Sequence, residues 1–182
     1  LGLELPLRAL FAHPTLAELA RAAEQAGQAH QPAITARSRS ATLPLSWAQQ
    51  RLWFLDRLDR AASAAYHMPA ALRLRGRLDR SALRAALERI VARHENLRTT
   101  FVSIDDVPRQ QIAADAGFAL AEHDLRALHG HERRAAVERI SADEACQPFD
   151  MAHGPLIRGQ LLCLADDEHV LLLTQHHIIS DG

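Results

Sequence analysis

The chain has 182 residues and a nearly balanced charge, with 21 basic and 22 acidic residues and a formal net charge of −1 when histidine is neutral. This balance gives no strong positive field of the kind that attracts nucleic acid or an anionic membrane, so both classes of partner are disfavoured. Only two cysteines are present, and neither a signal peptide nor an apolar run of membrane-spanning length is recognisable, so a reducing cytoplasm is the expected location.

The first 27 residues are predicted to form two short helices. Thr15 and Glu18 have the spacing of a capping box, and the apolar stripe that follows them ends at Gly27. We expect these helices to belong to a larger unit. Residues 28–43 mix Gln, Pro, Ser, Thr and Arg without a sustained period, which is typical of an interdomain linker.

A second body is predicted to begin at Pro44. Ser46 and Gln49 repeat the capping-box spacing before the amphipathic segment WAQQRLWFLDRL, in which we expect the side chains of Trp53 and Phe54 to lie in the core. Residues 70–75 alternate as a strand does, and Asp79 is placed to cap the long helix that follows.

The rest of the chain alternates between expected strands and helices. Extended segments are predicted over 99–112, with a turn at Asp105 and Asp106, and over 118–123. A charged helix is predicted over 129–146, and two apolar strands follow it. This order predicts an α/β fold with a mixed sheet.

The last of these strands runs into the sequence HHIISDG at 176–182. Successive side chains of a strand point to opposite faces, so we expect only one of His176 and His177 to face a substrate and the other to be structural. An imidazole in a cleft can take a proton from an attacking amine, hydroxyl or thiol. Asp181 would then be an orienting or ion-paired carboxylate, and Gly182 a backbone that turns sharply or approaches a ligand.

The same seven residues also fit a purely structural explanation. In that case the histidines are satisfied by backbone carbonyls and Ser-Asp-Gly is an ordinary turn. A metal site is disfavoured, because the 11 histidines are scattered and neither Cys146 nor Cys163 has a ligand-like spacing to them.

Four separated segments together resemble a known family. They are SWAQQRLWFL at 46–55, RHENLRTTF at 93–101, QPFDMAHGPLIR at 147–158 and HHIISDG at 176–182. In order and rough spacing they resemble the opening motifs of the condensation domains of nonribosomal peptide synthetases, and the resemblance covers residues 44–182. Upstream, residues 1–24 resemble the last helices of a peptidyl carrier domain. The implied organisation is carrier-domain helices over 1–27, a linker over 28–43 and the first part of a condensation domain over 44–182.

The resemblance implies a mixed-sheet, chloramphenicol-acetyltransferase-like half-domain and a chemistry. The amine of an aminoacyl thioester on a downstream carrier attacks the thioester carbonyl of an upstream carrier, and an amide forms. His177 matches the family's catalytic second histidine, and His176 matches the first, structural one. Asp181 matches a structural acid, and Gly182 a residue whose backbone lies near the reacting thioester.

The remaining matched residues belong to framework motifs, so they are expected to support the architecture rather than to touch substrate. They are Ser46, Gln49, Arg51, Arg93, His94 and Arg98. Whether His177 acts as a general base, or positions the amine and stabilises charge in the tetrahedral state, is left open by the sequence.

The resemblance also implies partners. These are upstream and downstream carrier domains whose substrates hang on 4′-phosphopantetheine, and neighbouring adenylation domains; no metal is implied. The carrier's attachment serine and the second half of the condensation domain are not recognisable in the chain, and both of its ends look cut. We therefore expect a piece of a longer polypeptide that is inactive alone.

Two other functions remain open. Epimerisation domains share the histidine motif, although SWAQQRLWFLDRLD favours condensation, and a non-catalytic half-domain that only docks carriers is the alternative outside enzymology. No epimerisation domain separates the carrier-like and condensation-like segments, so an L-configured donor is expected.

Overall fold

The computed structural model describes residues 5–27, 35, 42–59, 63–115 and 117–180. It divides into two compact units, residues 1–38 and 39–182, which are described separately.

The first unit contains two short helices, α1 (Leu7–Ala12) and α2 (Leu16–Glu24). The predicted capping box is present, because the Thr15 hydroxyl accepts a hydrogen bond from the Glu18 backbone N–H at 3.3 Å and the Glu18 carboxylate accepts one from the Thr15 N–H at 3.3 Å. Helix α2 ends at Glu24, before the predicted end at Gly27. Neither helix has a buried residue. The two helices therefore form no core of their own.

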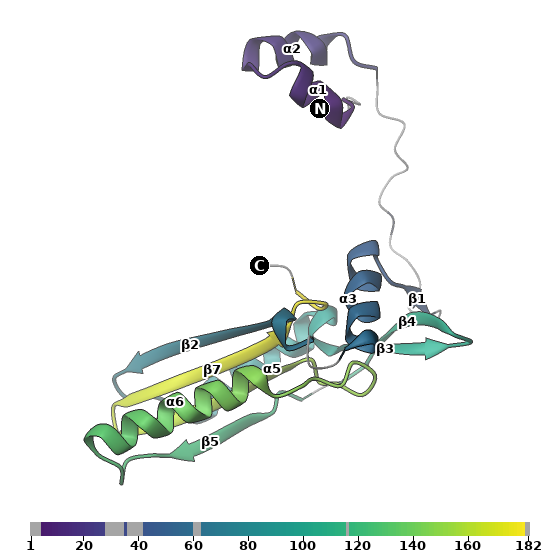
Figure 1. The fold of residues 1–182 in the computed structure, drawn as a ribbon. Coiled ribbons are helices and arrows are strands. Elements are labelled where there is room, and N and C mark those ends of the chain that lie inside the picture. The colour runs from purple at the N-terminus through teal and green to yellow at the C-terminus, as the bar shows by residue number, and fades with distance from the viewer. Residues whose placement is uncertain (1–4, 28–34, 36–41, 60–62, 116, 181–182) are drawn as a thin grey trace. The chain divides into compact units, whose positions relative to one another are not determined.

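The second unit is built on a four-stranded sheet in the order β2-β7-β6-β5. Its strands are β2 (His67–Arg75), β5 (Leu120–Asp124), β6 (Ile157–Ala165) and β7 (Glu168–His176). Strands β2, β7 and β5 of this sheet are labelled in Figure 1. Strands β5 and β6 are parallel, whereas β7 is antiparallel to both β6 and β2. The predicted mixed sheet is thus confirmed.

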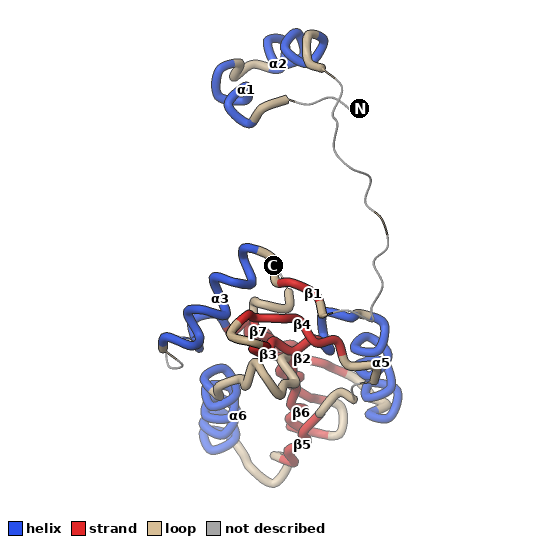
Figure 2. Tube along the Cα trace, turned by 90° about the vertical axis from the view of Figure 1, so that its right-hand side faces the viewer, coloured by secondary structure: helices blue, strands red, loops and turns tan. Residues whose placement is uncertain are grey.

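Helices cover opposite faces of this sheet, α5 (Arg80–Arg93) on one side and α6 (Gly130–Cys146) on the other (Figure 2). Because side chains alternate along a strand, β6 supplies both cores. Leu161 packs in the cluster that contains α5, and its neighbour Leu162 packs in the cluster that contains α6. Both leucines are completely buried, so the sheet is the central layer of a three-layer α/β/α unit.

A smaller antiparallel sheet has the order β1-β4-β3. Its strands are β1 (Leu43–Pro44), β3 (Thr99–Ile104) and β4 (Val107–Ile112). The hairpin turn lies at Asp105 and Asp106, as predicted, and both residues have positive φ angles of 49° and 59°. Aspartate tolerates this left-handed conformation, which a tight hairpin requires.

Helix α3 (Trp47–Leu58) begins with the predicted capping box between Ser46 and Gln49. The expectation that its aromatic side chains lie in the core is correct only for Trp53, which packs against a buried cluster. Phe54 is 60% exposed. Leu52 and Trp53 both pack against that cluster, so the buried stripe of α3 includes Trp53 and leaves Phe54 outside it.

Candidate functional site

The two motif histidines at the end of β7 lie in different environments. His176 is the last residue of the strand and is completely buried, whereas His177 lies in the turn that follows and is half-buried. The predicted division between one inward and one accessible histidine is therefore seen in the structure.

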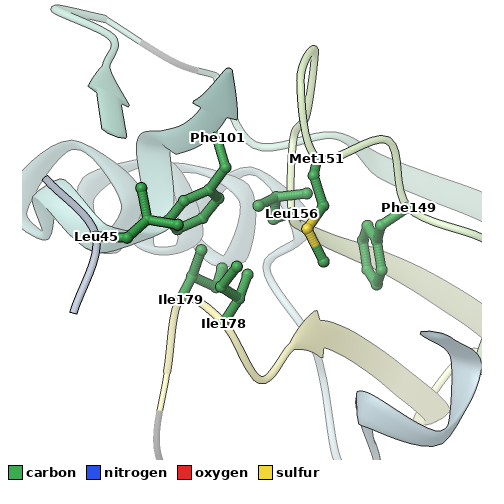
Figure 3. Close-up of a cluster of buried hydrophobic side chains, with 7 residues drawn as sticks. All are labelled: Leu45, Phe101, Phe149, Met151, Leu156, Ile178 and Ile179. Atoms are coloured by element: carbon green, nitrogen blue, oxygen red, sulfur yellow. The ribbon is translucent and has the colours of Figure 1, made fainter. Parts of the chain in front are cut away.

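The turn after β7 is anchored by the hydrophobic core. Ile178 and Ile179 are each 3% exposed, and they point into a cluster with Leu45, Phe101 and Leu156 (Figure 3). Burying two isoleucines stabilises the turn by roughly 3–6 kcal/mol before entropy is counted. Such anchoring limits the movement of His177, which immediately precedes them.

His176 is held as a neutral, structural ring. Its Nδ1 accepts a hydrogen bond from the Ile178 backbone N–H at 3.1 Å, so the ring hydrogen lies on Nε2, which is 3.3 Å from the Ser63 hydroxyl. Burial, with a smaller contribution from the nearby His67, lowers the pKa of His176 to about 4, while Asp56 opposes the shift. His176 therefore stays uncharged near neutral pH.

This buried histidine makes the protein sensitive to acid. The unfolded chain takes up a proton at this position near pH 6.5 and the folded chain only near pH 4, so stability is lost as the pH falls through that window. The contribution is about 3 kcal/mol. Between pH 6.5 and pH 4, the free energy of unfolding should fall by about 3 kcal/mol less in His176→Asn than in the wild type.

The measurement is urea denaturation at a series of pH values. His131→Asn, which changes an exposed residue of α6, is the matched control and should follow the wild-type pH dependence. If the free energy of unfolding of His176→Asn changed with pH as the wild type's does, His176 would not be the titrating group.

His177 is oriented by backbone contacts on both its main chain and its ring. Its N–H donates to the Tyr66 carbonyl at 2.9 Å, and its Nδ1 lies 2.8 Å from the Ser180 carbonyl oxygen. A carbonyl only accepts hydrogen bonds, so Nδ1 carries the ring hydrogen in the neutral form. The lone pair that can accept a proton is then on Nε2.

His177 lines a cavity of about 340 Å³. The lining residues are Ser46, Ala48, Gln49, Leu52, Asn96, His177, Ile178, Ile179 and Ser180. They come from three of the segments that the sequence singled out, around residues 46–55, 93–101 and 176–182. Two larger cavities, of about 560 and 460 Å³, contain neither motif histidine.

The other predicted site residues are distributed differently. Arg51 and Arg93 are exposed, and His94 is the exposed C-cap of α5. The side chain of Arg98 is only 15% exposed and donates a hydrogen bond to the Ala113 carbonyl, which ties the segment before β3 to the end of β4. None of these four lines the His177 cavity. Asp181 and Gly182 lie outside the described residues.

The structure adds residues that the sequence did not single out. Asn96 lines the cavity and lies within RHENLRTTF, next to the residues chosen there. Ser63 and His67 contact His176 from far away in the sequence, the rings of His67 and His176 having centroids 5.8 Å apart. No local pattern marks Ser63, so only the folded chain reveals it.

Two further features concern metals and membranes. Within the described part of the chain, no three His, Cys, Asp or Glu side chains gather as a metal site. No helix among the same residues is long and apolar enough to cross a bilayer.

The sequence has close curated relatives. Malpibaldin synthetase of Mortierella alpina is 49% identical over 187 aligned residues, which cover 100% of this chain and 3% of that protein. Malpinin synthetase of the same organism is 42% identical, and the alignment covers 100% of this chain and 2% of that protein. Phosphinothricin tripeptide synthetase PhsB of Streptomyces viridochromogenes is 42% identical and is covered to 15%, with 98% of this chain aligned. The chain thus spans a small part of each relative.

Solved structures share the fold. The starter condensation domain of rhizomide synthetase RzmA matches with a TM-score of 0.71 and 29% identity, over 79% of this chain and 34% of that one. The X-domain from teicoplanin biosynthesis matches with a TM-score of 0.69 and 36% identity, over 81% of this chain and 30% of that one. The mixed α/β architecture is therefore that of the chloramphenicol-acetyltransferase-like condensation domains.

The family model described as the condensation domain matches residues 39–182, which include the whole sheet, both covering helices and the His177 cavity. Together with the synthetase relatives, this match shows that the chain belongs to the condensation-domain family of nonribosomal peptide synthetases.

Proposed function

We propose that residues 44–182 are the first part of a condensation domain that joins a carrier-bound acyl or peptidyl donor to a carrier-bound aminoacyl acceptor. The observation that carries this proposal is the placement of His177. Its ring is oriented through Nδ1 by the Ser180 carbonyl, and it lines a cavity with residues of two other motif segments.

In the proposed reaction the acceptor amine attacks the thioester carbonyl carbon of the donor. A C–N bond forms, the C–S bond breaks, and the sulfur of the donor's 4′-phosphopantetheine leaves as a thiol once it is protonated. Nε2 of His177 accepts a hydrogen bond from the amine and takes its proton as the amide forms. Tethering both substrates to carriers supplies further acceleration, because pre-organised geometry replaces high concentration.

The crystallised relatives support acyl transfer. A RzmA starter condensation domain variant, with 27% identity to this chain and a TM-score of 0.70, was crystallised in complex with C8-CoA and Leu-SNAC. Those two ligands are an acyl and an aminoacyl thioester, which are the two substrate classes that the proposed reaction needs.

The proposed organisation places the end of a carrier domain at residues 1–27 and a linker at 28–43. Leu7, Phe11 and Leu16 are 72%, 82% and 88% exposed, so the described helices present apolar surface that a larger domain would cover. The alignment with malpibaldin synthetase also extends over this segment, since it covers 100% of the chain. We further propose that the domain works with neighbouring adenylation domains and a second, downstream carrier. Its donor is proposed to have the L configuration, and its location is proposed to be the cytoplasm.

A non-catalytic binding role is the second candidate. The X-domain from teicoplanin biosynthesis, 37% identical with a TM-score of 0.70, was solved in complex with OxyB. A domain of this fold can therefore serve as a docking surface, and in that case the parent protein would bind partners without joining the two substrates.

The test uses the intact synthetase module with only its upstream carrier loaded, in deuterated water, and then adds a loaded downstream carrier. Condensation predicts that the donor stays unchanged until the acceptor arrives and then leaves the upstream carrier. Deuterium at the donor α-carbon without acceptor would indicate epimerisation. A donor that stays in place throughout would indicate a binding role.

A further inference from the structure

The backbone of Ile178, the residue that follows His177, is held at both its N–H and its carbonyl. The Ile178 N–H donates to Nδ1 of His176 at 3.1 Å, and the Ile178 carbonyl accepts a hydrogen bond from the side-chain amide of Gln49 at 3.3 Å. Its side chain is buried in the core. Ile178 is therefore fixed on three sides, directly next to the residue proposed to carry the chemistry.

Gln49 uses both ends of its amide. The Oε1 atom accepts from the Ser46 backbone N–H at 2.9 Å, which completes the capping box of α3, while the Nε2 atom reaches across to Ile178, 129 residues later in the chain. The capping bond explains why a residue with a carboxamide or carboxylate stands at this position. It does not explain why the second end of the side chain points at the His177 turn.

We propose that Gln49 is a positioning residue for His177, acting through the Ile178 carbonyl. The inference rests on the proposed function of His177 and adds a link from the first turn of α3 to the reacting centre. A displacement of the Ile178 carbonyl rotates the backbone that carries His177, and a shift of about 1 Å in a reacting group can cost about 10²-fold in rate.

The capping box offers a selective substitution. In Gln49→Glu the carboxylate still accepts from the Ser46 N–H, so the helix cap is kept. It has no hydrogen to donate, and its charge repels the Ile178 carbonyl. Gln50→Glu is the matched control, because it places the same charge on the same turn and removes a bond to the Leu45 carbonyl, 3.2 Å long, that does not reach the His177 turn.

In the intact module we expect Gln49→Glu to lower the single-turnover rate of peptide-bond formation by about 10- to 100-fold, without raising the KM for the added downstream carrier. Gln50→Glu should stay within about twofold of the wild type, and the two variants should have the same melting temperature, because each loses one side-chain hydrogen bond. Gln49→Met, which has no charge, should also lose rate but should melt lower, because it loses the bond from the Ser46 N–H as well as the bond to the Ile178 carbonyl.

Three outcomes would overturn the inference. They are equal rates in Gln49→Glu and Gln50→Glu, a wild-type rate in Gln49→Met, and a loss in Gln49→Glu that appears only in KM or melting temperature. Failure of the proposed function is distinguishable, because it would show as no product from the wild-type module, or as full activity of a variant that lacks the His177 imidazole.

Discussion

Replacing His177 with alanine is expected to lower peptide-bond formation by the intact module by about 10²- to 10⁴-fold. The substitution removes the Nε2 lone pair that we propose takes the amine proton, together with the hydrogen bond from Nδ1 to the Ser180 carbonyl. Because the side chain is half-buried in a turn anchored by Ile178 and Ile179, the fold should survive the change.

The measurement is the amount of dipeptidyl product on the downstream carrier, with carrier loading followed separately. Loading should be normal in His177→Ala, because adenylation and phosphopantetheine attachment do not use this domain. His94→Ala is the control, since His94 is an exposed histidine in another motif segment and does not line the cavity. Undiminished product from His177→Ala would remove His177 from the chemistry.

A second large effect is expected on stability, from Glu144. Its side chain is 3% exposed and lies 2.5 Å from Nε of Arg158, whose side chain is 14% exposed. The Arg158 guanidinium also stacks 3.9 Å from the centre of the Phe149 ring, and Phe149 in turn contacts the rings of His67 and His176. The ion pair therefore joins the end of α6 to the surroundings of the motif histidines.

Glu144→Ala should lower the free energy of unfolding by about 3–5 kcal/mol, because it leaves the Arg158 charge buried without its partner. Glu168→Ala breaks a more exposed pair with Arg73, 2.6 Å long, and should cost at most about 1 kcal/mol. Chemical denaturation of both variants makes the comparison. Equal losses would mean that the Glu144 pair is not effectively buried in solution.

The parts of the fold that follow from short-range interactions could be predicted from the sequence. The capping boxes at Thr15 and Ser46, the cap at Asp79 and the turn at Asp105 and Asp106 each depend on residues within three positions of one another. The sequence also predicts that His176 and His177 lie in different environments, although the structure separates them because β7 ends at His176 and His177 lies in the turn that follows.

The parts that depend on distant contacts could not be predicted. Ser63 lies within hydrogen-bond distance of His176, 113 residues later in the sequence, and Gln49 donates a hydrogen bond to Ile178, 129 residues later. The exposure of Phe54 depends on which face of α3 packs on the core, and the helical period alone does not select that face for adjacent aromatic residues. The roles of such residues become visible only when the sheet and its turn are assembled.

Intact-protein mass spectrometry of the downstream carrier tests the proposed condensation reaction most directly. After both carriers of the parent module are loaded, the downstream carrier should gain the mass of the donor acyl group as an amide, while the upstream carrier returns to its free thiol form. An acceptor whose amine is acetylated should gain nothing, because the nucleophile is blocked. Two loaded carriers with unchanged masses, in a module whose domains are folded, would contradict peptide-bond formation by this domain.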